Sequence, residues 1–334
     1  MRVAMFSAQD YERGLLNELN ASHGHDLVYL DALLESETAP LAAGFPAVSV
    51  FVNDTVDRDV LRHLARGETK IVATRCTGFN HIDLEAAEEF GIEVVRVSNY
   101  SPNSVAEFAV GLLLALNRKI HRAYHRTRES DFRLDGLMGF DLVGRTVAVI
   151  GTGKIGTIFG RIMAGFGCTV IGFDVHRSPE FERIGGRYVD AEGVETADVI
   201  SMHCPLTPET YHIVGRRTLA RVKNGALLIN TSRGGLVDTE AAIDALKSGR
   251  LGGMALDVYE QEAGLFYRDF SSTVISDDVL QRLISFPNVI VTGHQAFFTR
   301  EALSTILGTT LESISEFESG RALTNRISHT RSNG

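Results

Sequence analysis

The sequence lacks a long apolar run, paired cysteines and a block of one charge sign. No stretch of about 18 apolar residues occurs, so no membrane-spanning helix is expected. The three cysteines, Cys76, Cys168 and Cys204, lie far apart, which argues against a disulfide framework or a thiolate zinc site. We therefore expect free thiols in a reducing compartment, a cytoplasmic location and no bound metal.

The charge balance also argues against nucleic acid as a partner. The formal net charge is −9, and basic residues occur only as scattered pairs such as Arg216 and Arg217. A net negative surface repels phosphate backbones, so a general nucleic-acid binder is not expected. The apolar run at the N-terminus, residues 1–7, is too short for a signal peptide and is more typical of a first strand.

Short apolar runs alternate with helical-period stretches almost throughout the 334 residues, of which 44% are hydrophobic and 22% charged. This alternation predicts an α/β fold with doubly wound parallel sheets in two domains. The expected strands are residues 3–6, 48–52, 71–74, 94–97, 146–150, 169–173, 199–203, 226–229, 253–258 and 289–291. Shorter helices are expected at 83–90, 154–166 and 240–248.

Two long helices are predicted as well. Residues 101–128 begin at a Ser-Pro-Asn start signal and contain only Gly111 as a breaker, so we expect one helix that bridges two domains or forms a dimer contact. Residues 299–320 are expected to form the second long helix, which ends at Gly320. The longest irregular stretch, 262–278, is a candidate element beside a cleft.

A glycine motif follows the strand at 146–150. Gly151 would make the tight turn, Gly153 would admit a pyrophosphate, and Gly156 would allow close packing of the following helix. Asp174 ends the next strand about 20 residues later, where a carboxylate accepts hydrogen bonds from a ribose diol. A carboxylate repels a 2′-phosphate, so the sequence predicts NAD (NADH) as the cofactor, although Arg177 could soften this preference.

The position of this motif predicts the domain boundaries. About 100 residues of another α/β unit precede it, and the last helix is expected to return to that unit. We therefore expect a discontinuous substrate-binding domain at 1–100 and 299–334, and an NAD-binding domain at 101–298.

Polar side chains follow three later strands. Arg233 follows the strand at 226–229, Glu262 lies beyond the strand at 253–258, and His294 follows the strand at 289–291. Open α/β sheets bind ligands at the carboxyl ends of their strands. We therefore expect these three residues at one edge of the sheet, as candidate catalytic residues.

The ordered motifs resemble those of the D-2-hydroxyacid dehydrogenase family. They are the glycine motif, Thr-Ser-Arg-Gly-Gly at 231–235, Asp-Val-Tyr-Glu-Gln-Glu at 257–262, Gly-His-Gln-Ala-Phe at 293–297, and further blocks at 75–80, 116–124 and 203–208. Within the family, the sequence is most similar to the fermentative bacterial D-lactate dehydrogenases. The resemblance implies a Rossmann-type cofactor domain, a flavodoxin-like substrate domain and an active-site cleft between them.

The resemblance also implies NADH-dependent reduction of pyruvate to D-lactate by a homodimer or homotetramer. Arg233 would bind the substrate carboxylate, His294 would donate the proton, and Glu262 would favour the imidazolium and orient its ring. The implied substrate contacts are Thr77, Gly78, Tyr100 and Phe297. The implied cofactor contacts, besides the three glycines and Asp174, are Lys154, Ile155, Cys204, Pro205, Thr210, Thr231, Ser232 and Asp257, the last near the carboxamide. Thr210 stands where relatives commonly carry asparagine, so its contact departs from the family pattern.

Two alternatives stay open at this point. The same chemistry could act on another 2-keto acid, such as hydroxypyruvate, glyoxylate or phenylpyruvate. A non-catalytic NAD-sensing scaffold of the corepressor type would share the fold, but such proteins carry long partner-binding extensions, and only a short Ser/Arg tail at 328–334 is a candidate here.

Overall fold

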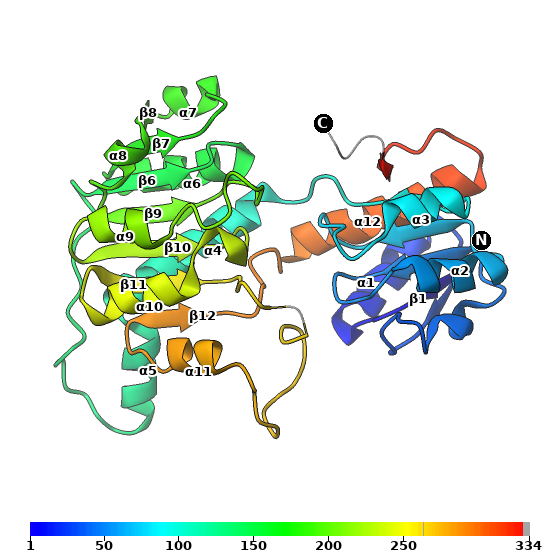
Figure 1. The fold of residues 1–334 in the computed structure, drawn as a ribbon, viewed down its shortest axis with the longest axis horizontal. Coiled ribbons are helices and arrows are strands. Elements are labelled where there is room, and N and C mark those ends of the chain that lie inside the picture. The colour runs from blue at the N-terminus through cyan, green and yellow to red at the C-terminus, as the bar shows by residue number, and fades with distance from the viewer. Residues whose placement is uncertain (263, 330–334) are drawn as a thin grey trace. The chain divides into compact units, whose positions relative to one another are not determined.

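The computed structural model describes residues 1–262 and 264–329 (Figure 1). Its contacts divide the chain into two compact units, Met1–Ser101 with Phe298–Gly334, and Pro102–Phe297. Residues 330–334, which include most of the Ser/Arg tail, lie outside the described residues. In the described part of the chain no helix is both long enough and apolar enough to cross a bilayer.

The unit Pro102–Phe297 is built on a seven-stranded parallel sheet. Its order is β12-β11-β10-β9-β6-β7-β8. The chain moves outward from β6 in one direction and then returns to its other side at β9, so the sheet has a switch point between these two strands, where ligands bind in such folds. The strands are β6 (Thr146–Ile150), β7 (Thr169–Phe173), β8 (Arg187–Tyr188), β9 (Val199–Met202), β10 (Ala226–Asn230), β11 (Leu251–Leu256) and β12 (Val289–Val291).

Helices cover both faces of this sheet, as a buried parallel sheet requires. One apolar cluster packs α4 and α6 against one face, and a second packs α9 and α10 against the other. The helices are α4 (Pro102–Arg118), α5 (Ile120–Arg128), α6 (Lys154–Gly165), α7 (Pro179–Arg183), α8 (Ala191–Val194), α9 (Arg216–Arg221), α10 (Thr239–Lys247) and α11 (Asp278–Ile284), with the 3₁₀ turn η2 (Gly234–Leu236).

The single long helix predicted for 101–128 is wrong. The structure has two helices, α4 and α5, separated by Lys119, whose φ of 53° is left-handed. Just before the break, the Asn117 side chain accepts a hydrogen bond from the Phe140 amide (3.0 Å) and donates one to its carbonyl (2.8 Å). The end of α4 thus coincides with a contact to Phe140, which lies 23 residues further along the chain.

The other unit contains a six-stranded sheet in the order β13-β5-β4-β3-β1-β2, parallel except for the β13–β5 pair. The order of β1 to β5 is the flavodoxin-like one. The strands are β1 (Arg2–Met5), β2 (Asp26–Tyr29), β3 (Ala47–Val50), β4 (Ile71–Thr74), β5 (Glu93–Val95) and β13 (Arg326–Ile327). Sequence patterns missed β2 and β13 here, and β8 in the other unit.

Helix α12 (Arg300–Glu318) returns the end of the chain to this unit. It packs against α1 and β4, and Figure 1 shows it as the long orange helix of this unit. Thr299 caps its first turn by accepting a hydrogen bond from the Ala302 amide, and Gly320 follows its end at a φ of 66°. The remaining helices are α1 (Asp10–Asn20), α2 (Arg58–Arg66) and α3 (Leu84–Glu89), with the 3₁₀ turn η1 (Ala39–Ala42).

Candidate active site

The glycine turn after β6 has the geometry of a pyrophosphate cradle. Gly151 has a φ of 92°, and a Cβ added to it would lie 2.4 Å from the Cys204 amide nitrogen. A Cβ on Gly156 would lie 1.9 Å from the Gly151 carbonyl oxygen, whereas one on Gly153 would meet nothing within 4 Å. Two glycines therefore permit close packing, and the third leaves open space at the start of α6, whose first residues are Lys154 and Ile155. These features fit a dinucleotide phosphate.

Asp174 is held at the end of β7. Its carboxylate accepts hydrogen bonds from the backbone amides of Thr152 (2.6 Å) and His176 (2.9 Å). The Thr152 hydroxyl also contacts the Tyr188 hydroxyl at 2.6 Å. The Arg177 guanidinium carbon lies 5.2 Å from the centre of the Tyr188 ring. The carboxylate is thus fixed beside the glycine turn, as a ribose-binding acid must be.

The loops after β9 and β10 carry the other predicted cofactor contacts. The Ser232 hydroxyl donates to the Cys204 carbonyl at 2.6 Å and joins the two loops. The Thr210 hydroxyl donates to the Pro205 carbonyl at 2.7 Å. Burial raises the pKa of the Cys204 thiol to about 11, so it is a neutral thiol at physiological pH. The Thr231 hydroxyl is buried with no hydrogen-bond partner among the described residues, which makes it available to a ligand.

Asp257 occupies a buried position under the loop that follows β12. Its carboxylate accepts hydrogen bonds from the Thr292 hydroxyl (2.6 Å) and from the amides of Gln295 (2.9 Å) and Ala296 (2.7 Å). Burial raises its pKa. The sequence indicated only a cofactor contact for Asp257. It did not predict these hydrogen bonds to residues that precede and follow His294.

His294 and Glu262 form a direct pair. Nδ1 of His294 lies 3.0 Å from Oε1 of Glu262, and the other oxygen of Glu262 accepts a hydrogen bond from the Tyr259 amide at 3.0 Å. Both side chains are about one quarter exposed. Because Nδ1 is engaged, Nε2 is the ring atom left to exchange a proton with a substrate.

Arg233 stands on the strand next to these residues. Strands β10, β11 and β12 are neighbours, so Arg233, the Asp257–Glu262 segment and His294 all follow adjacent carboxyl ends. The Arg233 side chain is exposed, and its backbone carbonyl accepts a hydrogen bond from the Asn230 side chain at 2.8 Å. A Cβ on Gly234 would lie 2.1 Å from the Tyr259 backbone, so the two segments touch through their main chains.

The loop after β4 carries two predicted substrate contacts, Thr77 and Gly78. It starts at Arg75, which is buried and donates hydrogen bonds to Glu12 (3.0 Å) and to the Phe6 carbonyl (2.8 Å). The Thr77 hydroxyl is buried and has no partner among the residues described. Tyr100 and Phe297, the other predicted contacts, are half-buried.

A further pair near Arg233 was also missed from sequence. Nε2 of His212 lies 2.7 Å from Oε1 of Glu260, and the Tyr211 hydroxyl donates to the same oxygen at 3.1 Å. Glu260 thereby links the segment after β11 to the loop after β9. Its only sequence signal is its place two residues before Glu262, which does not distinguish it from a solvated acid.

Known proteins are similar to this chain in sequence and in fold. Residues 110–296 match the family model described as D-isomer specific 2-hydroxyacid dehydrogenase, NAD binding domain. A 2-hydroxyacid dehydrogenase homolog of Schizosaccharomyces pombe is 52% identical over 321 residues, which cover 96% of this chain and 97% of that protein. The apo-structure of D-lactate dehydrogenase from Escherichia coli is 45% identical, with a TM-score of 0.91 over 98% of this chain and 100% of that chain. D-lactate dehydrogenase with NAD⁺ from Lactobacillus jensenii is 31% identical, with a TM-score of 0.84 over 98% of this chain and 100% of that one.

These similarities confirm the family, the fold of two parallel-sheet domains and the cofactor that the motifs predicted. The chain therefore belongs to the D-isomer specific 2-hydroxyacid dehydrogenases, a family of NAD-binding oxidoreductases.

Proposed function

We propose that the protein reduces pyruvate to D-lactate with NADH, reversibly. The observation that carries this proposal is the Glu262–His294 pair, at the same sheet edge as the exposed Arg233. The similarity to the Escherichia coli D-lactate dehydrogenase structure supports pyruvate as the substrate.

In this proposal Arg233 binds the substrate carboxylate. A guanidinium presents a planar fork of donors that matches a carboxylate, and charge-assisted bonds of this kind are strong. The same cation draws electron density from the neighbouring ketone, which favours attack at the carbonyl carbon. Thr77, Gly78, Tyr100 and Phe297 are the other proposed substrate contacts.

His294 is the proposed proton donor. NADH supplies the hydride that converts the ketone carbon to an alcohol carbon. The carbonyl oxygen gains negative charge as this happens, and Nε2 of His294 gives it a proton. Glu262, bound to Nδ1, stabilises the charged ring before transfer and holds its orientation.

Cofactor binding is assigned to the glycine turn, Asp174 and the loops after β9 and β10. The open space at Gly153 receives the pyrophosphate, and Asp174 accepts hydrogen bonds from the adenosine ribose. Lys154, Ile155, Cys204, Pro205, Thr210, Thr231, Ser232 and Asp257 complete the proposed cofactor contacts.

The test is NADH oxidation by the purified protein with a panel of 2-keto acids, followed by an enantiomer-specific assay of the product. We expect fast turnover of pyruvate to D-lactate. Turnover of only a bulkier or phosphorylated acid would retain the mechanism and change the substrate. Absence of turnover with every acid, together with NADH binding, would favour the NAD-sensing scaffold.

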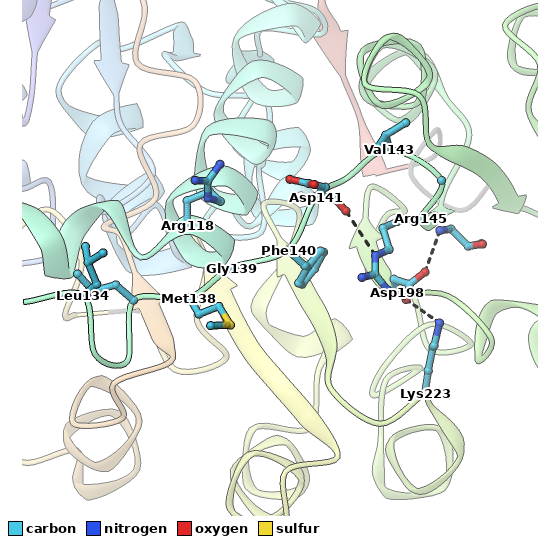
Figure 2. A pocket seen from close by; sticks show the side chains of 13 residues that line it. Arg118, Leu134, Met138, Gly139, Phe140, Asp141, Val143, Arg145, Asp198 and Lys223 are labelled. Atoms are coloured by element: carbon cyan, nitrogen blue, oxygen red, sulfur yellow. Dashed lines mark hydrogen bonds and ion pairs between the residues drawn. The ribbon is translucent and has the colours of Figure 1, made fainter.

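We further propose a homodimer or homotetramer. Four apolar side chains between α5 and β6 are strongly exposed, namely Phe132 (74%), Leu134 (81%), Met138 (90%) and Val143 (69%). Leu134, Met138 and Val143 are among the residues that line a pocket of about 1020 Å³, and Figure 2 shows their side chains. A patch of this kind is typical of a protein–protein contact, and a second copy of the chain is the proposed occupant. Light scattering after size-exclusion chromatography tests this, with Met138→Glu expected to weaken the assembly.

A cytoplasmic location is also part of the proposal. Among the described residues, no disulfide joins Cys76, Cys168 or Cys204. Free thiols persist in a reducing compartment, which supports this location. Fractionation of cells that express the tagged protein tests it.

A further inference from the structure

The catalytic histidine has an uncommon backbone conformation. His294 has a φ of 54°, in the left-handed region that non-glycine residues seldom adopt. Such a conformation persists only when neighbouring groups hold it. The contacts around its backbone therefore decide where its ring lies.

Two groups hold this backbone. Asp257 binds the residues that flank His294, through the Thr292 hydroxyl and the amides of Gln295 and Ala296. The His294 carbonyl itself accepts a hydrogen bond of 2.7 Å from the Tyr267 hydroxyl. The Tyr267 ring also lies beside the imidazole, with 6.1 Å between the ring centres.

Tyr267 and Glu262 are connected through one turn. The amides of Leu265 and Phe266 both donate to the Glu262 carbonyl, at 3.0 and 3.1 Å. Tyr267 follows directly, at a φ of 63°. The same turn thus presents the Glu262 carboxylate to Nδ1 of His294 and the Tyr267 hydroxyl to its carbonyl.

We propose that Tyr267 is a positioning residue for proton transfer, which holds the His294 ring against Glu262 and toward the substrate. This inference rests on the proposed role of His294. Without the Tyr267 hydroxyl, the His294 backbone loses the bond that fixes its carbonyl and can relax from the left-handed region. The ring then spends less time against Glu262, and proton donation slows while cofactor binding is unchanged.

The decisive variant is Tyr267→Phe, which keeps the ring and removes the hydroxyl. We expect kcat for 2-keto acid reduction to fall about tenfold, the value of one lost hydrogen bond of typical strength. The KM for NADH should stay within about twofold, since Tyr267 lies outside the proposed cofactor contacts. The solvent deuterium isotope effect on kcat should rise, because proton transfer becomes more rate-limiting.

Asp277→Ala is the matched control. Asp277 anchors the far end of the same segment, where it accepts hydrogen bonds from the Tyr259 hydroxyl (2.9 Å) and the Leu280 amide (2.8 Å). We expect this variant to lower the melting temperature but to leave kcat and the isotope effect within about twofold of the parent. Equal losses of kcat in the two variants would mean that Tyr267 acts only through general stability, and would overturn the inference.

The double variant that combines Tyr267→Phe with Glu262→Gln tests whether the two residues act through the same ring. If both residues act through the His294 ring, their effects on kcat are not additive. Additive effects, or an unchanged Tyr267→Phe enzyme, would overturn the inference. If His294→Gln itself retains full turnover, the proposed role of His294 fails instead, which distinguishes the two.

Discussion

Oε1 of Glu262 lies 3.0 Å from Nδ1 of His294, although 32 residues separate them in the chain. The pair joins the segment after β11 to the loop after β12, two neighbouring strands of one sheet. A carboxylate at this distance engages Nδ1 and fixes which nitrogen faces away from it. We propose that proton transfer at the site depends on this contact.

Replacement of Glu262 by glutamine tests that contact. Loss of a charged hydrogen bond is expected to lower kcat about 10- to 100-fold near neutral pH. Steady-state rates with a saturating 2-keto acid at neutral pH provide the measurement. Glu260→Gln alters the neighbouring pair with His212 instead, and its kcat should stay within about twofold of the parent.

Arg233 is expected to govern substrate affinity. Arg233→Lys keeps the charge but loses the planar fork, so the KM for pyruvate should rise about 10- to 100-fold. The dissociation constant of NADH, from fluorescence quenching, should be unchanged. Arg216→Lys is the control, because Arg216 pairs with Asp244 on the surface at 3.1 Å. An unaltered KM in the Arg233 variant would remove this residue from the site.

Much of this site was predictable from sequence because parallel strands all end at the same edge. Arg233, Glu262 and His294 each follow an apolar run, and the strands that these runs form are neighbours in the sheet. The glycine turn was equally readable, since its spacing is set by local sterics at Gly151 and Gly156.

The features that sequence missed depend on contacts between distant segments. The break at Lys119 occurs at a residue that is neither glycine nor proline, beside the contact between Asn117 and Phe140. Tyr267 was visible only as part of an irregular stretch, because its partner is a backbone carbonyl 27 residues away. Strands β8 and β13 have only two residues each, and all three strands lie at edges of their sheets, where β2 is only partly buried, so their apolar patterns are weak.

Asp174 is expected to set the cofactor preference. Asp174→Asn keeps the shape and the acceptor oxygen for the Thr152 amide but removes the charge. The ratio of kcat/KM for NADPH to that for NADH should therefore rise about tenfold or more, because a carboxylate both binds the ribose diol and repels a 2′-phosphate. Asp190→Asn provides the control, since Asp190 caps α8 through the Gly193 amide at 2.8 Å. A constant ratio in the Asp174 variant would contradict the assigned ribose contact.

His203 should make the stability of the NAD-binding unit depend on pH. Burial lowers the pKa of His203 to about 3, and its ring lies 2.9 Å from the Ser201 hydroxyl and 4.9 Å from the centre of the Phe159 ring. In the unfolded chain a histidine has a pKa of about 6.5, so between these values the unfolded state binds more protons than the folded state. The contribution of His203 to the free energy of unfolding is therefore complete above about pH 6.5 and falls by about 1.4 kcal/mol per pH unit toward pH 3.

The measurement is urea unfolding of the parent and of His203→Gln at pH 6.5 and pH 4.5. The parent should lose about 2 kcal/mol more than the variant over this interval, since glutamine does not titrate. Subtracting the loss of unfolding free energy in the variant from that in the parent removes the contribution of every other group that titrates in both proteins. His125→Gln, at an exposed position of α5, should follow the parent. Equal losses in the parent and in His203→Gln would mean that His203 takes up its proton without unfolding, and would place water beside its ring.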